Sequence, residues 1–195
     1  MRIAIALFDD AEELDIVGPY EVLAAWAVGH PEDGVRVVTV SETEAPVTCA
    51  KGLQIVPHTT WLSAQHIDVL VYPGGQGTRR NLDPGDPVHR RLQNLMHEGT
   101  LMTSVCTGSL VYAAAGLLHN RPATTHWSAL DLLRTLDASI DVRPDARFVD
   151  DVEVVTAAGV SAGIDMALHL VARLQSPERA REVRREIQYD PAPPV

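Results

Sequence analysis

The chain has 195 residues, of which 46% are hydrophobic and 22% are charged. This composition is typical of a globular protein that buries its own core, and it argues against a disordered chain. The 26 acidic residues outnumber the 16 lysines and arginines, and the formal net charge of −10 disfavours binding to nucleic-acid phosphates. We therefore expect one domain over residues 1–195, with residues 189–195 as a proline-rich surface tail and no nucleic-acid partner.

The amino-terminal apolar run, residues 3–8, leads directly into Asp9 and Asp10. It is too short for the apolar region of a signal peptide, and no other stretch approaches the length of a membrane span. We expect a cytoplasmic protein that does not bind membranes. Its two cysteines, Cys49 and Cys106, are then expected to be free thiols.

Strands and helices alternate along the chain. Buried strands are predicted at residues 2–8, 35–40, 66–72 and 101–105, a short hairpin or meander at 47–56 with its turn at Lys51-Gly52, a short segment at 122–125, and an antiparallel pair at 148–156 about Asp150-Asp151. Helices are predicted at 15–28, 87–98, after Cys106, at 127–136, at 161–174 and from Pro177 onward. The pattern predicts an α/β fold with a mostly parallel sheet covered by helices on both faces.

Two of the predicted helices have patterned faces. In the helix at 161–174 we expect one apolar face, and in the last helix we expect ion pairs rather than a nucleic-acid site. The apolar face consists of Ile164, Leu168, Val171 and Leu174, and the ion-paired face of Arg179, Arg181, Arg184 and Arg185 with Glu178, Glu182 and Glu186.

Cys106 is predicted at the turn between a buried strand and the helix that follows it. Backbone N–H groups at the start of a helix favour a thiolate, so we expect the pKa of Cys106 to lie below the value of about 8.5 of a free thiol. A lone cysteine is otherwise often a small packing residue. The small residues Thr107, Gly108 and Ser109 favour the functional interpretation, because they let a substrate approach the backbone.

Two further features follow strand ends, where sites form in open α/β sheets. The turn Gly74-Gly75-Gln76-Gly77 fits neither a dinucleotide nor a phosphate loop, and it is either a bare tight turn or the source of an oxyanion-binding N–H at Gly75. Asp15 is either a helix-capping carboxylate or, if its helix starts beside Cys106, a group that carries protons. Asp9 and Asp10 are alternatives by position and are more typical of a solvated loop.

Several motifs together resemble the ThiJ/PfpI superfamily, within its glutamine-amidotransferase-like, flavodoxin-like fold, and within it the isocyanide-hydrating enzymes of bacteria. The motifs are residues 104–110 (SVCTGSL), 115–118 (AGLL), 123–127 (ATTHW), 162–165 (AGID), 14–19 (LDIVGP) and 189–194 (YDPAPP). Transcriptional regulators share two of these motifs but append a basic helix-turn-helix domain, for which the chain to Val195 leaves no room.

The resemblance implies hydration of an isocyanide to an N-substituted formamide, with Cys106 as nucleophile, Asp15 as proton carrier and the amide and hydroxyl of Thr107 beside the sulfur. It places Gly75 and Gln76 opposite the cysteine, with Gly108 and His126 as further candidates for the oxyanion or substrate pocket. It also implies a homodimer and a reaction without a cofactor. The alternatives are a glyoxalase-like or amidohydrolase-like enzyme that uses the same cysteine, and a redox sensor.

Peptidase-like members of the superfamily have a histidine directly after the cysteine, where this chain has Thr107. His126 could approach the pocket, although we expect it to order the wall of the site. The other seven histidines show no ligand spacing, and we predict no metal.

Overall fold

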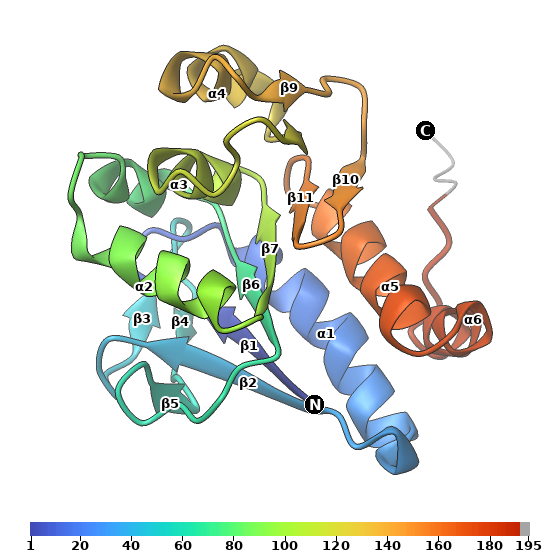
Figure 1. Ribbon diagram of the computed structural model, residues 1–195. Coiled ribbons are helices and arrows are strands. Elements are labelled where there is room, and N and C mark those ends of the chain that lie inside the picture. Colours follow the sequence, from blue (N-terminus) through green and yellow to red (C-terminus); the bar gives the residue numbers. More distant parts are fainter. Residues whose placement is uncertain (192–195) are drawn as a thin grey trace.

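The computed structural model describes residues 1–191, and the last four residues of the expected tail lie outside this range. A seven-stranded sheet runs through the molecule in the order β10-β11-β7-β6-β1-β2-β5 (Figure 1). All neighbouring pairs are parallel except β10 and β11. The strands are β1 (Arg2–Ala6), β2 (Arg36–Ser41), β5 (Thr59–Thr60), β6 (Val69–Tyr72), β7 (Leu101–Val105), β10 (Phe148–Asp151) and β11 (Val154–Ala157). The predicted α/β class and mostly parallel sheet are confirmed.

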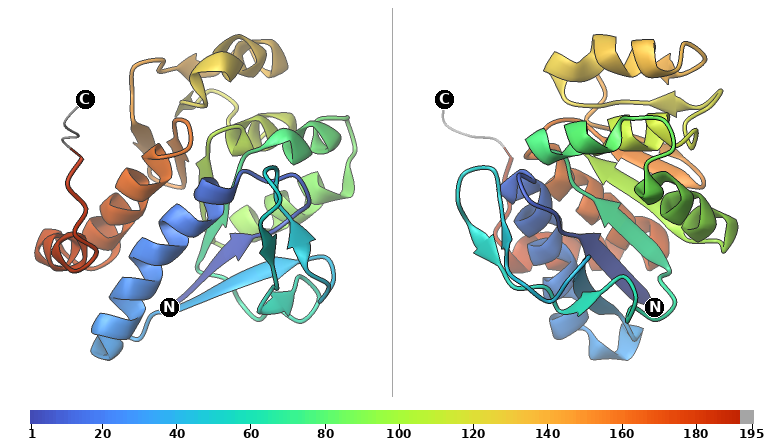
Figure 2. Two further views of the ribbon diagram at one scale, coloured as in Figure 1. Left: turned by 180° about the vertical axis from the view of Figure 1, so that it is seen from behind. Right: turned by 90° about the vertical axis from the view of Figure 1, so that its left-hand side faces the viewer.

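Helices cover both faces of the sheet. On one face α1 (Glu13–Gly29) lies beside α5 (Ala162–Leu174), and α6 (Pro177–Glu186) packs against both, as the two views of Figure 2 show. On the other face lie α2 (Pro87–His97) and α3 (Gly108–Ala114), with α4 (Leu130–Leu136) against α3.

The side chains of β1 show why such strands are apolar along their whole length. Ile3 and Ile5 are buried with Trp26 in the core under α1 and α5, while Ala4 and Ala6 are buried in the core under α2 and α3. Successive residues of a strand point to opposite faces, and both faces here are covered. Removal of apolar surface from water on both faces is therefore the main force that holds this sheet in place.

Two small pairs of strands lie outside the main sheet. The predicted hairpin forms between β3 (Val47–Thr48) and β4 (Gln54–Ile55), and Gly52 at its turn has a φ of 95°. The segment at 122–125 contributes β8 (Pro122–Ala123), which pairs with β9 (Asp141–Val142). Neither β9 nor the edge strand β5 was predicted, because two-residue strands carry too little alternation to be recognised.

The turn of the antiparallel pair was predicted two residues too early. Asp150 and Asp151 lie within β10, opposite Val155 and Val154, and the chain reverses at Val152, whose φ is 59°. The carboxylate of Asp150 accepts hydrogen bonds from Arg173 (2.7 Å) on α5 and from the Val152 N–H (3.1 Å). These contacts let an aspartate remain in the strand, where the sequence pattern favoured a turn.

The expected face of α5 was also only partly right. Its fully buried residues include Met166, Ala167 and Leu170, while Ile164 and Leu168 are half-buried, since α1 and α6 flank the helix as well as the sheet. On α6 the ion pairs are confirmed for Arg179 with Glu182 and for Arg181 with Glu178, and Arg179 also reaches the carboxylate of Asp33. Within residues 1–191, no helix combines the length and apolar character needed to cross a bilayer.

Candidate active site

Cys106 follows the last residue of β7 and precedes α3, as predicted, with a φ of 56°. This left-handed conformation is uncommon for a residue with a Cβ atom, and it is held by hydrogen bonds on both sides of the residue. The Cys106 N–H donates to the carbonyls of Ala157 (3.2 Å) and Ala158 (3.0 Å), and its own carbonyl accepts from the hydroxyls of Thr125 (2.9 Å) and Ser109 (3.2 Å). The side chain is thereby fixed at the carboxyl end of the central strands, with 6% of the residue exposed.

Hydrogen-bond donors from two segments face the Cys106 sulfur. They are the N–H and hydroxyl of Thr107 and the N–H of Val160, and each lowers the pKa of the thiol. Val160 has a φ of 47°, a conformation that is uncommon for a β-branched residue. These donors can stabilise negative charge on the sulfur or on a group bonded to it.

Asp15, in the first turn of α1, is fully buried beside Cys106. One carboxylate oxygen, Oδ2, accepts a hydrogen bond from the Gly74 N–H at 2.8 Å. The other, Oδ1, is buried without a hydrogen-bond partner. Burial raises the pKa of Asp15 to about 7, and the Gly74 N–H and the neighbouring thiol only partly oppose this rise. Asp15 can therefore gain or lose a proton near neutral pH.

The expectation of a lowered pKa at Cys106 is wrong for the free site. Burial, followed by the charge of Asp15, raises the pKa of the thiol to about 12, and the three donors do not offset them. Protonation of Asp15 removes the second of these effects, so the two groups titrate as one coupled pair, which holds two protons below about pH 7 and one proton above it. In this pair the thiolate forms when the proton moves to Asp15.

The glycine turn supports the loop from which α1 begins. A Cβ atom on Gly75, whose φ is 112°, would lie 2.4 Å from the Asp10 carbonyl oxygen and from the Glu12 nitrogen, and one on Gly77 would lie 2.2 Å from the Asp9 carbonyl oxygen. The loop is tied down by hydrogen bonds from the Glu12 N–H to the Gly74 carbonyl and from the Gly77 N–H to the Asp10 carbonyl, both 3.0 Å long. Only glycines permit this approach, which brings the start of α1 to the cysteine turn.

Gly74 rather than Gly75 contributes its N–H to the Asp15–Cys106 pair. A Cβ atom on Gly74 would lie 2.5 Å from the Thr107 nitrogen and 2.9 Å from Asp15 Oδ2, so the three residues meet at one point. The Gly75 N–H donates to the hydroxyl oxygen of Thr107 at 2.9 Å. The expected oxyanion donor at Gly75 is therefore already engaged, and Gly75 acts on the site through Thr107.

Three predicted pocket residues remain, Gln76, Gly108 and His126. Gln76 is exposed at the start of the 3-10 helix η2 (Gln76–Asn81), and Gly108 permits close packing, because a Cβ atom there would lie 2.4 Å from the Tyr72 carbonyl oxygen. His126 caps the 3-10 helix η3 (Trp127–Ala129), with Nδ1 2.8 Å from the Ser128 hydroxyl. Its ring packs against Gly159, next to Val160.

Cys49 provides a contrast within the same protein. It is also a buried free thiol, and burial followed by the charge of Glu13 raises its pKa to about 11. The groups that act on it are carboxylates, those of Glu13, Asp9 and Glu12, and none of them stabilises a thiolate. Cys106, by contrast, lies beside a carboxyl group that can accept its proton and N–H groups that lower its pKa.

Sequence reasoning missed Gly74, Val160 and Thr78, whose hydroxyl lies 3.2 Å from that of Thr107. Gly74 carries a signal in the Gly74-Gly75 pair, whereas nothing in a lone valine or threonine indicates a backbone donor or a buried hydroxyl contact.

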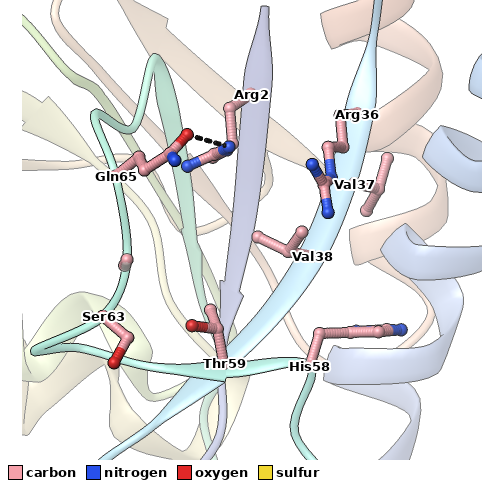
Figure 3. A pocket seen from close by; sticks show the side chains of 9 residues that line it. Arg2, Arg36, Val37, Val38, His58, Thr59, Ser63 and Gln65 are labelled. Carbon is pink, nitrogen blue, oxygen red and sulfur yellow. Dashed lines mark hydrogen bonds between the residues drawn. The ribbon is translucent and has the colours of Figure 1, made fainter.

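A separate groove of about 420 Å³ opens near the amino ends of β1 and β2 (Figure 3). Arg2 and Arg36 line it on neighbouring strands, and Arg2 donates to Gln65 at 2.6 Å. It contains neither cysteine, and the Cys106 turn lies at the opposite end of the parallel strands.

Comparison with known proteins places the chain among relatives along its whole length. It is 40% identical over 194 residues to isonitrile hydratase of Pseudomonas putida, covering 100% of this chain and 81% of that protein. It is 26% identical over 177 residues to glutathione-independent glyoxalase DJR-1.2 of Caenorhabditis elegans, covering 90% of this chain and 89% of that protein.

Solved structures agree with this placement. The crystal structure of a ThiJ/PfpI family protein from Pseudomonas syringae matches with a TM-score of 0.86 at 33% identity, covering 100% of this chain and 77% of that one. Drosophila melanogaster DJ-1beta shares the fold, with a TM-score of 0.83 at 22% identity over 97% of this chain and 98% of its own. The profile of the DJ-1/PfpI family matches residues 1–173. The chain therefore belongs to the DJ-1/PfpI family.

Proposed function

We propose that the protein is a lyase that hydrates isonitriles, also called isocyanides, to N-substituted formamides. The observation that carries the proposal is the buried Asp15–Cys106 pair, which places a carboxyl group with a pKa of about 7 beside a thiol that three donors face. The similarity to an isonitrile hydratase along the whole chain supports the same reaction.

In the first step the Cys106 sulfur bonds to the terminal carbon of the isonitrile. The lone pair of that carbon takes the proton that the pair holds, which gives a thioimidate, R–N=CH–S–Cys106, and leaves Asp15 ionised. The donors on Thr107 and Val160 stabilise the charge on sulfur before the bond forms.

In the second step water adds to the thioimidate. Asp15 takes a proton from water, the oxygen bonds to the CH carbon, and the electrons of the C=N bond move to nitrogen, which takes the proton from Asp15. The C–S bond then breaks, the hydroxyl proton returns to the pair, and R–NH–CHO leaves. A carboxyl group with a pKa near neutrality can both take and give these protons.

The geometry favours this reaction over the alternatives. Thr107 stands where a peptidase-like member would need a histidine, and Asp15 supplies the proton transfer that hydration requires and that a pure redox sensor does not. The C. elegans glyoxalase makes glyoxals the next substrates to assay.

The test is conversion of an aryl isonitrile to its formamide, followed by chromatography. Wild type should turn over, Cys106→Ala should be inactive, and Asp15→Asn should lose at least about a hundredfold. Cys49→Ala and Asp10→Asn are the matched controls and should retain the wild-type rate, since Cys49 lacks N–H donors and the Asp10 carboxylate pairs with Arg80. Wild-type turnover of methylglyoxal but of no isonitrile would overturn the proposal.

We further propose that the chain acts as one domain, as a homodimer and in the cytoplasm. Light scattering at twice the 21.2 kDa chain mass supports the dimer, and a monomer contradicts it.

A further inference from the structure

Thr78 is a fully buried residue of η2 that the proposed reaction does not use. Its hydroxyl oxygen lies 2.7 Å from the Gly75 carbonyl oxygen and 3.2 Å from the Thr107 hydroxyl oxygen. The Thr107 hydroxyl in turn accepts the Gly75 N–H at 2.9 Å and lies 3.2 Å from the same Gly75 carbonyl. Two hydroxyl groups therefore share the backbone N–H and carbonyl of one residue, Gly75.

Counting protons decides how the two hydroxyls are used. Each hydroxyl has one proton to donate, and it can accept at its lone pairs. The shortest of these contacts joins Thr78 to the Gly75 carbonyl, so the Thr78 proton belongs there. The Gly75 N–H occupies a lone pair of Thr107 and fixes the position of that hydroxyl oxygen. The Thr107 hydroxyl lies 3.2 Å from both the Gly75 carbonyl oxygen and the Thr78 oxygen, which is long for an O–H···O hydrogen bond. Its proton is therefore free to turn toward its other neighbour, the sulfur of Cys106, whose pKa this hydroxyl lowers.

We propose that Thr78 is a positioning residue for Cys106: by satisfying the Gly75 carbonyl, it directs the Thr107 hydroxyl proton to the sulfur. The inference rests on the proposed function only in taking Cys106 as the reacting thiol. It names a hydroxyl that touches neither the sulfur nor a substrate, and that acts through Thr107.

Removal of the Thr78 hydroxyl leaves the Gly75 carbonyl short of a donor. The Thr107 hydroxyl, 3.2 Å away, is the nearest replacement, and a proton donated there is lost to the sulfur. The thiolate then has two donors in place of three, so its formation and its reactivity fall.

The experiment measures the rate of Cys106 alkylation by iodoacetamide from pH 6 to 10, in a Cys49→Ala background so that one thiol reports. Thr78→Val should lower the rate about three- to tenfold at each pH below the thiol pKa, and Thr78→Ser should restore it. Thr103→Val is the matched control, because its buried hydroxyl donates to the Leu70 carbonyl at 2.8 Å, away from Thr107. This control should react at the wild-type rate.

A double-mutant cycle separates positioning from general damage. In a Thr107→Val background, Thr78→Val should have no further effect on alkylation, because the proton it directs is gone. Thr78→Ala repeats the test without added apolar atoms if Thr78→Val lowers the Tm by more than a few degrees. An unchanged alkylation rate in both variants, a Thr78→Ser variant as slow as Thr78→Val, or a full effect in the Thr107→Val background would overturn the inference.

Alkylation needs no isonitrile, so the result does not depend on the identity of the substrate. If wild type hydrates isonitriles, Thr78→Val should also lower kcat with KM unchanged, since Thr78 contacts Thr107 and touches neither the sulfur nor the substrate.

Discussion

The burial of Asp15 has a cost in stability that depends on pH. In the unfolded chain this carboxyl has its ordinary pKa of 3.8, and burial raises the pKa in the folded protein to about 7. Below pH 3.8 both states hold the proton and no cost arises. As the pH rises to about 7, the unfolded state releases a proton that the folded state keeps, so the free energy of unfolding falls. At 1.36 kcal/mol for each pH unit, the difference between 3.8 and about 7 corresponds to on the order of 4 kcal/mol.

Asp15→Asn removes this titration while keeping an oxygen that can accept the Gly74 N–H. We expect the variant to be more stable than wild type at pH 8, by up to about 4 kcal/mol, with the difference vanishing near pH 4. Urea unfolding at pH 4, 6 and 8 measures it. Asp10→Asn is the control, and it should change stability by less than about 1 kcal/mol because the Asp10–Arg80 pair is exposed. An Asp15→Asn variant that is less stable than wild type at pH 8, or a difference independent of pH, would refute the reasoning.

Three further predictions follow from the site. Ultraviolet titration should find the pKa of Cys106 well above 8.5 in wild type and lower in Asp15→Asn, because the variant lacks the carboxylate charge; an equal or higher pKa would count against the pair. Gly74→Ala should lose nearly all isonitrile turnover and lower the Tm, since its Cβ atom would lie 2.5 Å from the Thr107 nitrogen, whereas Gly29→Ala meets nothing within 4 Å and should match wild type in both assays. Val160→Gly should raise the free energy of unfolding by up to about 1 kcal/mol with turnover retained, because it relieves a β-branched residue at a φ of 47° and keeps the N–H; a loss of turnover would show that the valine side chain itself is needed.

The layers of the fold could be predicted because the signals are long and local. The buried strand at β1, the five-residue run before Cys106 and the helical spacing after it each extend over enough residues to be recognised. Short elements such as β5 and β9 pair through two residues only, and their pairing depends on a partner strand that the local sequence does not identify.

The sequence predicted which residues come together in the candidate site, but it did not predict the pKa of Cys106. Cys106, Asp15 and Thr107 come together because the glycine turn allows the start of α1 to lie against the end of β7. The direction of the Cys106 pKa was missed, since it depends on how deeply the thiol is buried beside Asp15. The Val160 donor was missed as well, because a valine at positive φ has no signature in sequence.

Intact-protein and peptide mass spectrometry of the enzyme quenched during turnover of an aryl isonitrile tests the central claim most directly. The account predicts a mass increase of one isonitrile on the peptide that carries Cys106 in wild type, and no such increase in Cys106→Ala. Formamide release at the wild-type rate with no adduct on Cys106, or with the adduct on Cys49, would contradict it.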